Sequence, residues 1–130
     1  MGKLEAAREF FAKDAYATKL TGAVIEEVAP DYAKCSVKLT DNHKNAYGAV
    51  MGGVIYTLAD FAFAVASNFE KRTTVSLVGQ VTFMSASKGS TLFAEARILK
   101  DGNRNCFYEV RVTDDTSKLI ATVSFTGAHI

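Results

Sequence analysis

Hydrophobic and polar residues follow two rhythms along this chain, and each rhythm predicts a different element. Apolar side chains between residues 3 and 13 recur at helical spacing, which predicts a short amphipathic helix. The run 21–29 has the composition of a strand, and residues 33–40 alternate strictly between apolar and polar. Because Pro30 and Asp31 supply a turn between these two runs, we predict a hairpin with one face in solvent.

The middle of the chain carries the longest apolar run. Residues 54–65, VIYTLADFAFAV, are apolar on nearly every side, which predicts a core helix buried all round. The run is shorter than the roughly 20 apolar residues that cross a membrane, and it contains an acid, Asp60, so a membrane span is excluded. A glycine-rich segment, NAYGAVMGG at 45–53, leads into this helix.

The C-terminal half has the pattern of strands separated by short turns. Four runs qualify: residues 73–84, 91–100, 105–113 and 119–126. Because such short links join antiparallel neighbours, we predict a meander of these four strands. The chain is then an α+β protein, with an antiparallel sheet of about six strands curled around one long helix. One flank of that helix would stay uncovered, and a second copy is the economical cover.

Composition narrows the class of protein. A chain of 130 residues fits a single domain, 1–130. Its 15 basic and 14 acidic residues form no basic stripe, which argues against a nucleic-acid partner. Cys35 and Cys106 are isolated, so we expect reduced core thiols and neither a metal site nor a disulfide. The amino terminus mixes acids and bases where a secretory signal needs an apolar run, so we expect a cytoplasmic protein without a membrane segment.

Asp60 is the residue in the central helix whose chemistry needs an explanation. A buried carboxylate requires hydrogen-bond partners or a shifted pKa. On a helix it shares its face with mostly small residues: Gly53, Tyr56, Thr57, Phe63, Ala64 and Ser67. These small residues leave room for a ligand or for a closely packed backbone, and the sequence leaves both readings open. An acid tied to Ser or Thr in the core is the structural alternative for Asp60.

The chain resembles the hotdog-fold acyl-thioesterases, specifically the phenylacetate-pathway type of small acyl-coenzyme A thioesterase. The likeness covers nearly the whole chain and is strongest in NAYGAVMGGVIYTLADFAFAVASN. It implies a helix wrapped by the sheet, dimers joined edge to edge or dimers of dimers, and active sites between protomers. The substrate would be an aryl- or medium-chain acyl-coenzyme A, with no separate cofactor and no metal.

The resemblance also assigns residues. It implies that Asn45 is the loop asparagine, Gly52 the glycine whose amide meets the thioester oxygen, and Asp60 the catalytic acid. Ser76 matches a hydroxyl that helps to position water. We assign four neighbouring residues to substrate binding: Gly53, Met51, Tyr56 and Thr57. For the glycines, Asn45 and Ser76, tight packing, loop capping and an ordinary strand serine are the structural alternatives.

The chain departs from the family's pattern at Met51. The family usually has histidine before the glycine pair, giving HGG where this chain has MGG. Methionine cannot replace the hydrogen bonding of imidazole. His43 is the nearby histidine that could substitute, whereas His129, beside the C-terminus, is expected at the surface. Three basic residues could meet the phosphates of coenzyme A or be solvated turn charges: Lys88, Arg72 and Arg104.

Spacing along the helix predicts a site shared by two chains. The first amides of a helix lack intrahelical partners and favour negative charge, so Gly52 and Gly53 suit an oxyanion. Asp60 could act as general base toward water or as a nucleophile forming an anhydride. Eight residues separate Gly52 from Asp60, roughly 12 Å along a helix, so one carbonyl cannot touch both. We therefore expect Asn45 and Gly52 of one chain to face Asp60 and Ser76 of another.

Two other functions remain as alternatives. A non-catalytic acyl-thioester binder or sensor would keep the pocket while Met51 weakens the chemistry. A hotdog dehydratase or hydratase ranks last, because that class usually relies on a histidine with an acid and the central helix has no histidine.

Overall fold

The computed structural model describes residues 1–130 and contains two long elements of helix, two short ones and six strands. The helices are α1 (Lys3–Phe11), the π-helical turn η1 (Tyr16–Thr21), the 3-10 turn η2 (Asp41–His43) and α2 (Gly52–Asn68). The strands are β1 (Val24–Ala29), β2 (Tyr32–Lys38), β3 (Thr74–Phe83), β4 (Thr91–Asp101), β5 (Asn105–Asp114) and β6 (Leu119–His129). Except for η1 and η2, each element was predicted within a few residues of these bounds.

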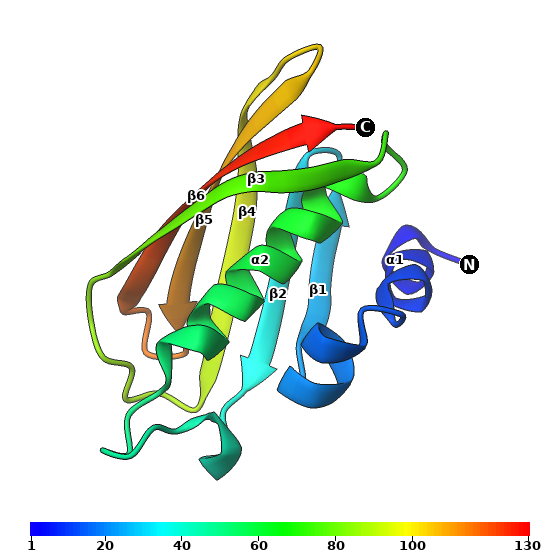
Figure 1. Ribbon diagram of the computed structural model, residues 1–130. Coiled ribbons are helices and arrows are strands. Elements are labelled where there is room, and N and C mark those ends of the chain that lie inside the picture. Colours follow the sequence, from blue (N-terminus) through cyan, green and yellow to red (C-terminus); the bar gives the residue numbers. More distant parts are fainter.

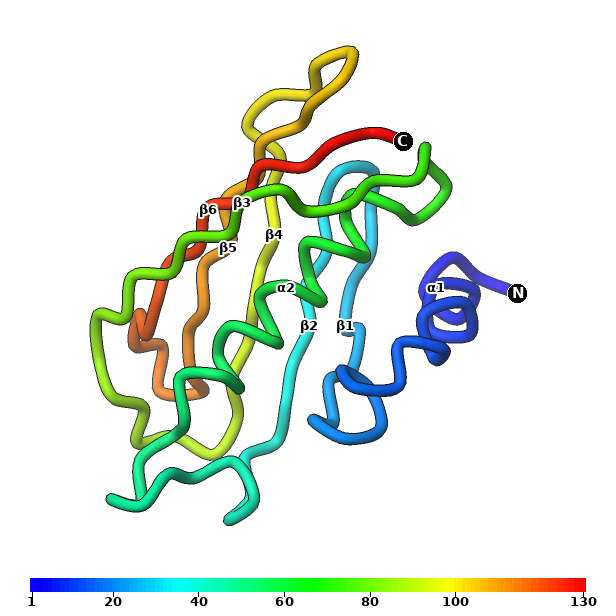
Figure 2. Tube along the Cα trace, in the orientation of Figure 1, coloured from blue at the N-terminus to red at the C-terminus, as the bar shows by residue number.

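The strands form one antiparallel sheet in the order β1-β2-β4-β5-β6-β3, and α2 lies across one face of it (Figure 1). The tube in Figure 2 shows the strands bending around that helix, with α1 beyond β1 at the edge of the sheet. The predicted α+β architecture, a sheet wrapped around one long helix, is confirmed. None of the helices combines the length and apolarity needed to span a bilayer.

The predicted four-strand meander is wrong at β3. Only β4, β5 and β6 follow one another as neighbours, whereas β3 pairs with β6 and β4 pairs with β2. The link from β3 to β4 is long enough to cross the end of the sheet, so its turn residues do not make a hairpin. Met84 N–H and Ser85 N–H both donate to the carbonyl of Ile120, which carries the chain along β6 before it crosses. Strand β3 consequently becomes an edge.

The core joins the inner face of the sheet to one side of α2. Phe63 of α2 stacks on Phe125 of β6, with ring centroids 4.6 Å apart, and meets Tyr108 of β5 edge-on at 5.3 Å. Leu58 is fully buried one and a half turns earlier. Burying each side chain of this size contributes roughly 1.5–3 kcal/mol, so these contacts fix where α2 lies on the sheet. The two cysteines are free and buried, as predicted.

The sequence predicted that the central helix is buried all round, and this is wrong for α2. Its buried residues form one broad side, and a stripe on the other side stays partly exposed: Gly53, Val54, Tyr56, Thr57, Asp60, Ala64 and Asn68. The sheet cannot enclose the helix completely because it curls around one side only. The stripe contains most of the small-residue face predicted around Asp60, while Phe63 and Ser67 of that face are buried.

Candidate active site

The start of α2 presents unpartnered backbone donors. Met51 is the residue that caps α2; its N–H donates to the carbonyl of His43 at 2.9 Å, and its carbonyl accepts from Val54 at 3.1 Å. The N–H groups of Gly52 and Gly53 donate to no protein atom. Because the positive end of the helix dipole adds to these free donors, the site favours an oxygen that carries negative charge.

A groove of about 530 Å³ opens beside Gly52. Its walls come from the loop before α2, the first turn of α2, the end of β3 and the segment after it: Ala49, Val50, Gly52, Ile55, Phe83, Met84, Ser85, Ala86 and Ser87. The Phe83 ring lies so close to Gly52 that a Cβ there would come within 2.9 Å of the ring. Sequence reasoning missed Phe83 and residues 84–87, because β3 was placed beside β4 rather than at the edge near α2.

Asn45 holds the loop in front of α2. Its Oδ1 accepts from Tyr47 N–H at 2.9 Å and from Ala49 N–H at 3.1 Å, which is the loop-capping role weighed for it. Gly48, at φ 80°, makes the turn inside this loop and needs the freedom of glycine. The side-chain NH₂ of Asn45 has no protein partner, so its two donors stay available to a ligand.

Asp60 is the acidic residue on the partly exposed stripe of α2. It is half-buried and makes no hydrogen bond or ion pair within the chain, so the structural alternative of an acid tied to Ser or Thr is wrong. Its carboxylate oxygens reach solvent, because no buried side-chain oxygen lacks a partner. Burial, and after it the negative charge of Asp14, raise the pKa of the Asp60 carboxyl above its ordinary value. A carboxylate with a raised pKa is a stronger base than one with the ordinary pKa of aspartate.

The remaining predicted residues lie at different distances from Asp60. Tyr56 and Thr57 lie on the same stripe, one turn earlier. The Tyr56 hydroxyl packs against the backbone of Gly79 in β3, and burial followed by the charge of Asp60 raises the pKa of Tyr56. Ser76 is exposed on β3 beside a bulge, and its hydroxyl makes no hydrogen bond to Asp60 within the chain.

The two histidines have structural partners. His43 is buried, with Nδ1 accepting from Thr40 N–H at 3.0 Å and Nε2 2.8 Å from the carbonyl of Thr21. Both ring nitrogens are therefore occupied, which excludes His43 as the substitute considered for a histidine at position 51. His129 was expected at the surface, and this is wrong, because its side chain is only 4% exposed. It bridges Thr74 Oγ1 at 2.8 Å and Asp101 Oδ1 at 2.7 Å.

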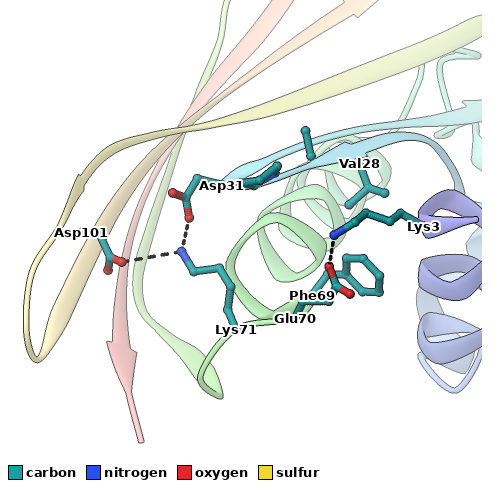
Figure 3. Close-up of a pocket in the computed structure, with 9 residues that line it drawn as sticks. Lys3, Val28, Asp31, Phe69, Glu70, Lys71 and Asp101 are labelled. Carbon is teal, nitrogen blue, oxygen red and sulfur yellow. Dashed lines mark hydrogen bonds and ion pairs between the residues drawn. The ribbon is translucent and has the colours of Figure 1, made fainter.

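A second cavity, of about 330 Å³, lies at the opposite end of α2 and contains none of the predicted site residues. Its charged groups are already paired with one another: Lys71 with Asp31 and Asp101, and Lys3 with Glu70 (Figure 3). Paired charges leave little for a ligand to bind, so the candidate site stays at the start of α2.

Loop, groove and helix together define a class of protein. A six-stranded antiparallel sheet wrapped around one long helix is a hotdog fold. The chain belongs to the thioesterase superfamily, whose family model matches residues 47–121.

Similar proteins agree with this membership. A putative esterase of Archaeoglobus fulgidus is 33% identical over 124 residues, covering 95% of this chain and 80% of the relative. Acyl-coenzyme A thioesterase 13 of Mus musculus is 33% identical over 106 residues, covering 78% of this chain and 76% of the relative. Among solved structures, the Escherichia coli PaaI protein from the phenylacetic acid degradation operon superposes with a TM-score of 0.90 over 98% of this chain and 94% of PaaI. At 22% identity, PaaI shows the shared fold.

Proposed function

We propose that this protein is an acyl-coenzyme A thioesterase that hydrolyses aryl- or medium-chain acyl thioesters to the free acid and coenzyme A. The observation that carries the proposal is Asp60, a half-buried carboxylate on the open side of α2 that has no hydrogen-bond or ion-pair partner. A partly buried acid without a partner lowers the stability of the fold, and proteins commonly keep such destabilising groups at functional sites.

The reaction divides between an acid and an amide. Asp60 takes a proton from water as the water oxygen adds to the thioester carbonyl, or adds to the carbonyl itself and forms an anhydride that water then cleaves. In either case the carbonyl oxygen becomes negative and accepts hydrogen bonds from Gly52 N–H and the Asn45 side chain. Collapse of the tetrahedral intermediate breaks the carbon–sulfur bond. Coenzyme A leaves as a thiolate, which takes the proton that Asp60 accepted or, in the anhydride route, a proton from water.

The groove beside Gly52 suits the arm of coenzyme A. Its lining is mainly apolar with the hydroxyl groups of Ser85 and Ser87, which matches a chain of methylene and amide groups. Lys88 follows directly in the sequence, is exposed, and has no ion-pair partner. It can meet the phosphates where the groove reaches solvent, whereas Arg72 donates to the carbonyl of Asn103.

A second copy completes the site in this proposal. Strand β3 is an edge, and it exposes apolar side chains where an edge would usually carry charge: Val75, Leu77 and Val78 are between 41% and 60% exposed. A second β3 would cover these side chains and extend the sheet across both chains. Within one chain, Gly52 and Asp60 are too far apart along α2 to reach the same carbonyl. The partner would therefore supply its Asp60 and Ser76 to the Gly52 of this chain.

The experiment follows free thiol release from a panel of acyl-coenzyme A esters. Asp60→Asn keeps the shape of the side chain and removes the base, so activity should fall at least about 100-fold. Glu109→Gln is the matched control, since Glu109 makes no hydrogen bond or ion pair and lies on β5 away from the groove. Equal rates for wild type and Asp60→Asn would remove Asp60 from the mechanism. Saturable binding without any thiol release would favour the sensor.

Mixing two inactive variants tests the shared site. If Asn45 and Asp60 act from different chains, a 1:1 mixture of Asn45→Ala and Asp60→Asn subunits forms hybrid dimers with one intact site. Random assembly makes half of the dimers hybrid, so about a quarter of wild-type activity should return. A mixture as inactive as its parents would place both residues of each site in the same chain.

A further inference from the structure

The wall of the groove opposite α2 is partly a loop. Residues 84–90 connect β3 to β4, and 84–87 line the groove. Backbone hydrogen bonds hold only its two ends, from Met84 and Ser85 to Ile120 and from Leu39 to the carbonyl of Ser90. Residues 86–89 make no backbone–backbone hydrogen bond, so side chains must hold them if the groove is to have a fixed width. Figure 2 shows this loop, in yellow-green, passing beside the orange turn that joins β5 to β6.

Two adjacent acids bind the loop: Asp114, the last residue of β5, and Asp115, the first residue of the β5–β6 turn. Asp114 Oδ2 accepts from the Ser87 hydroxyl at 2.8 Å. Asp115 accepts twice from Ser90, from the backbone N–H at 2.9 Å and from the hydroxyl at 2.7 Å. The turn also donates, because Lys118 Nζ lies 3.3 Å from the carbonyl of Ala86. Each end of residues 86–90 is therefore tied to the same turn.

Asp114 is itself held rigidly. Its side chain is buried and accepts from Thr116 N–H at 3.0 Å, from the Thr116 hydroxyl at 2.6 Å and from Lys118 N–H at 3.2 Å. Burial alone would raise the pKa of Asp114, but the hydroxyl groups of Thr116 and Ser87 donate to the carboxylate and lower the pKa overall. It therefore stays ionised and fixed at neutral pH, which makes it a firm anchor for Ser87.

The loop lies close to both acids at Gly89. A Cβ on Gly89 would collide with Asp115 Oδ1 and come within 3.2 Å of Asp114 Cβ. The loop backbone is thus pressed against the two acids, and Gly89 N–H donates to the Ser87 hydroxyl at 3.2 Å. The same serine serves the loop and the turn.

We propose that Asp114 and Asp115 are positioning residues that hold the 84–90 loop as a preformed wall for the arm of coenzyme A. The inference rests on the proposed function, because it uses the groove assigned to that arm. Neither acid lines the groove, and both act through Ser87 and Ser90. Their loss should weaken binding of the common coenzyme A portion and leave the chemical step unchanged, since a loosened loop must be ordered again on binding.

The test compares Asp115→Ala, Asp115→Asn and Asp114→Asn with wild type and with Glu109→Ala. For Asp115→Ala, KM should rise about fivefold for every acyl-coenzyme A ester while kcat stays within about twofold. Calorimetry with free coenzyme A should show affinity reduced by the same factor. Asp115→Asn keeps an acceptor for Ser90 N–H and should recover part of the loss. Hydrogen exchange at Ser90 should accelerate in Asp115→Ala and remain slow in Glu109→Ala.

The outcomes separate this inference from the proposed function. Unchanged KM and unchanged coenzyme A affinity in both Asp115→Ala and Asp114→Asn would overturn it, as would a fall in kcat at constant KM. Because Asp115 is exposed, its variants should fold even if Asp114→Asn does not. A wild type that binds coenzyme A but releases no thiol would refute only the hydrolase proposal, and the affinity comparison would still decide the role of the two acids. A wild type that does not bind coenzyme A would refute both.

Discussion

Gly52 and Gly53 are adjacent, yet a methyl group added to each would meet different surroundings. At Gly52 the new Cβ would lie 2.9 Å from Phe83 Cζ and 3.3 Å from Phe83 Cε1. At Gly53 it would meet nothing within 4 Å. The pair therefore separates the general effect of replacing a helix-start glycine from the particular effect of pushing the Phe83 ring.

The magnitude follows from what each change disturbs. The Phe83 ring is 54% exposed and can turn away, so Gly52→Ala should change the free energy of unfolding by less than about 1 kcal/mol, with the helix propensity of alanine offsetting the contact. The displaced ring and the methyl group would both crowd the Gly52 amide. Losing an oxyanion donor outright costs roughly 100- to 1,000-fold in kcat, so a crowded donor should cost about 10- to 100-fold.

Two measurements test this reasoning. Thiol release gives kcat for Gly52→Ala and Gly53→Ala, and urea unfolding shows whether both stay folded. The Gly52 variant should lose at least about ten times more activity than the Gly53 variant. Adding Phe83→Ala removes the obstructing ring, so the double variant should regain several-fold activity beyond what the two single effects predict, a coupling that a double-mutant cycle measures.

The reasoning fails if the Gly53 variant loses as much activity as the Gly52 variant, because the Phe83 contact would then be irrelevant. It also fails if the effects of Gly52→Ala and Phe83→Ala simply add. Either result would leave the free amide of Gly52 without support as the donor to the thioester oxygen.

Three further predictions concern charge and assembly. Because burial and then the charge of Asp14 raise the pKa of Asp60 above 3.8, ionised Asp60 lowers stability as pH rises through that raised pKa. Asp60→Asn should therefore melt higher than wild type at pH 7, with the gap closing toward pH 4, and equal melting temperatures at pH 7 would contradict this. His129→Ala removes two hydrogen bonds and should cost about 2 kcal/mol in urea unfolding at pH 7. The hydrogen bond from His129 lowers the pKa of Asp101, so this difference should shrink as pH falls below 3.8, and a pH-independent difference would count against the bridge. Leu77→Lys places a charge on the apolar edge of β3 and should give inactive monomers in sedimentation, whereas an active monomer would refute the shared site.

Local sequence was enough to predict the elements because each carries its own periodicity. The helix around Asp60 and the strands on both sides of it were found from spacing and turn residues alone. Strand order was not, because turn chemistry at 87–89 looks the same whether a link closes a hairpin or crosses the end of a sheet. That choice depends on β3 pairing with β6, which lies about 45 residues further along the chain.

Only part of the candidate site could be predicted from the sequence, because a local pattern shows which residues are neighbours along the chain and not which ones meet in the fold. The loop and the glycine pair are contiguous, so sequence places them together at the start of α2. His129 was misjudged because its partners, Asp101 and Thr74, lie 28 and 55 residues away. The contact of Asp114 with Ser87 was not anticipated either, since its sequence signal is only a turn rich in acids.

Met51 shows why a departure from the family's pattern can leave the rest of the site intact. The backbone carbonyl of Met51 accepts from Val54 N–H and its N–H donates to His43, whereas the residue is 56% exposed and does not line the groove. The shape of the helix start therefore depends on the main chain at position 51 and on the two glycines that follow. A histidine in the same place would add a hydrogen-bonding side chain to a helix start that already presents the two free N–H groups of Gly52 and Gly53. The missing imidazole should accordingly affect the orientation of the substrate more than the existence of the site.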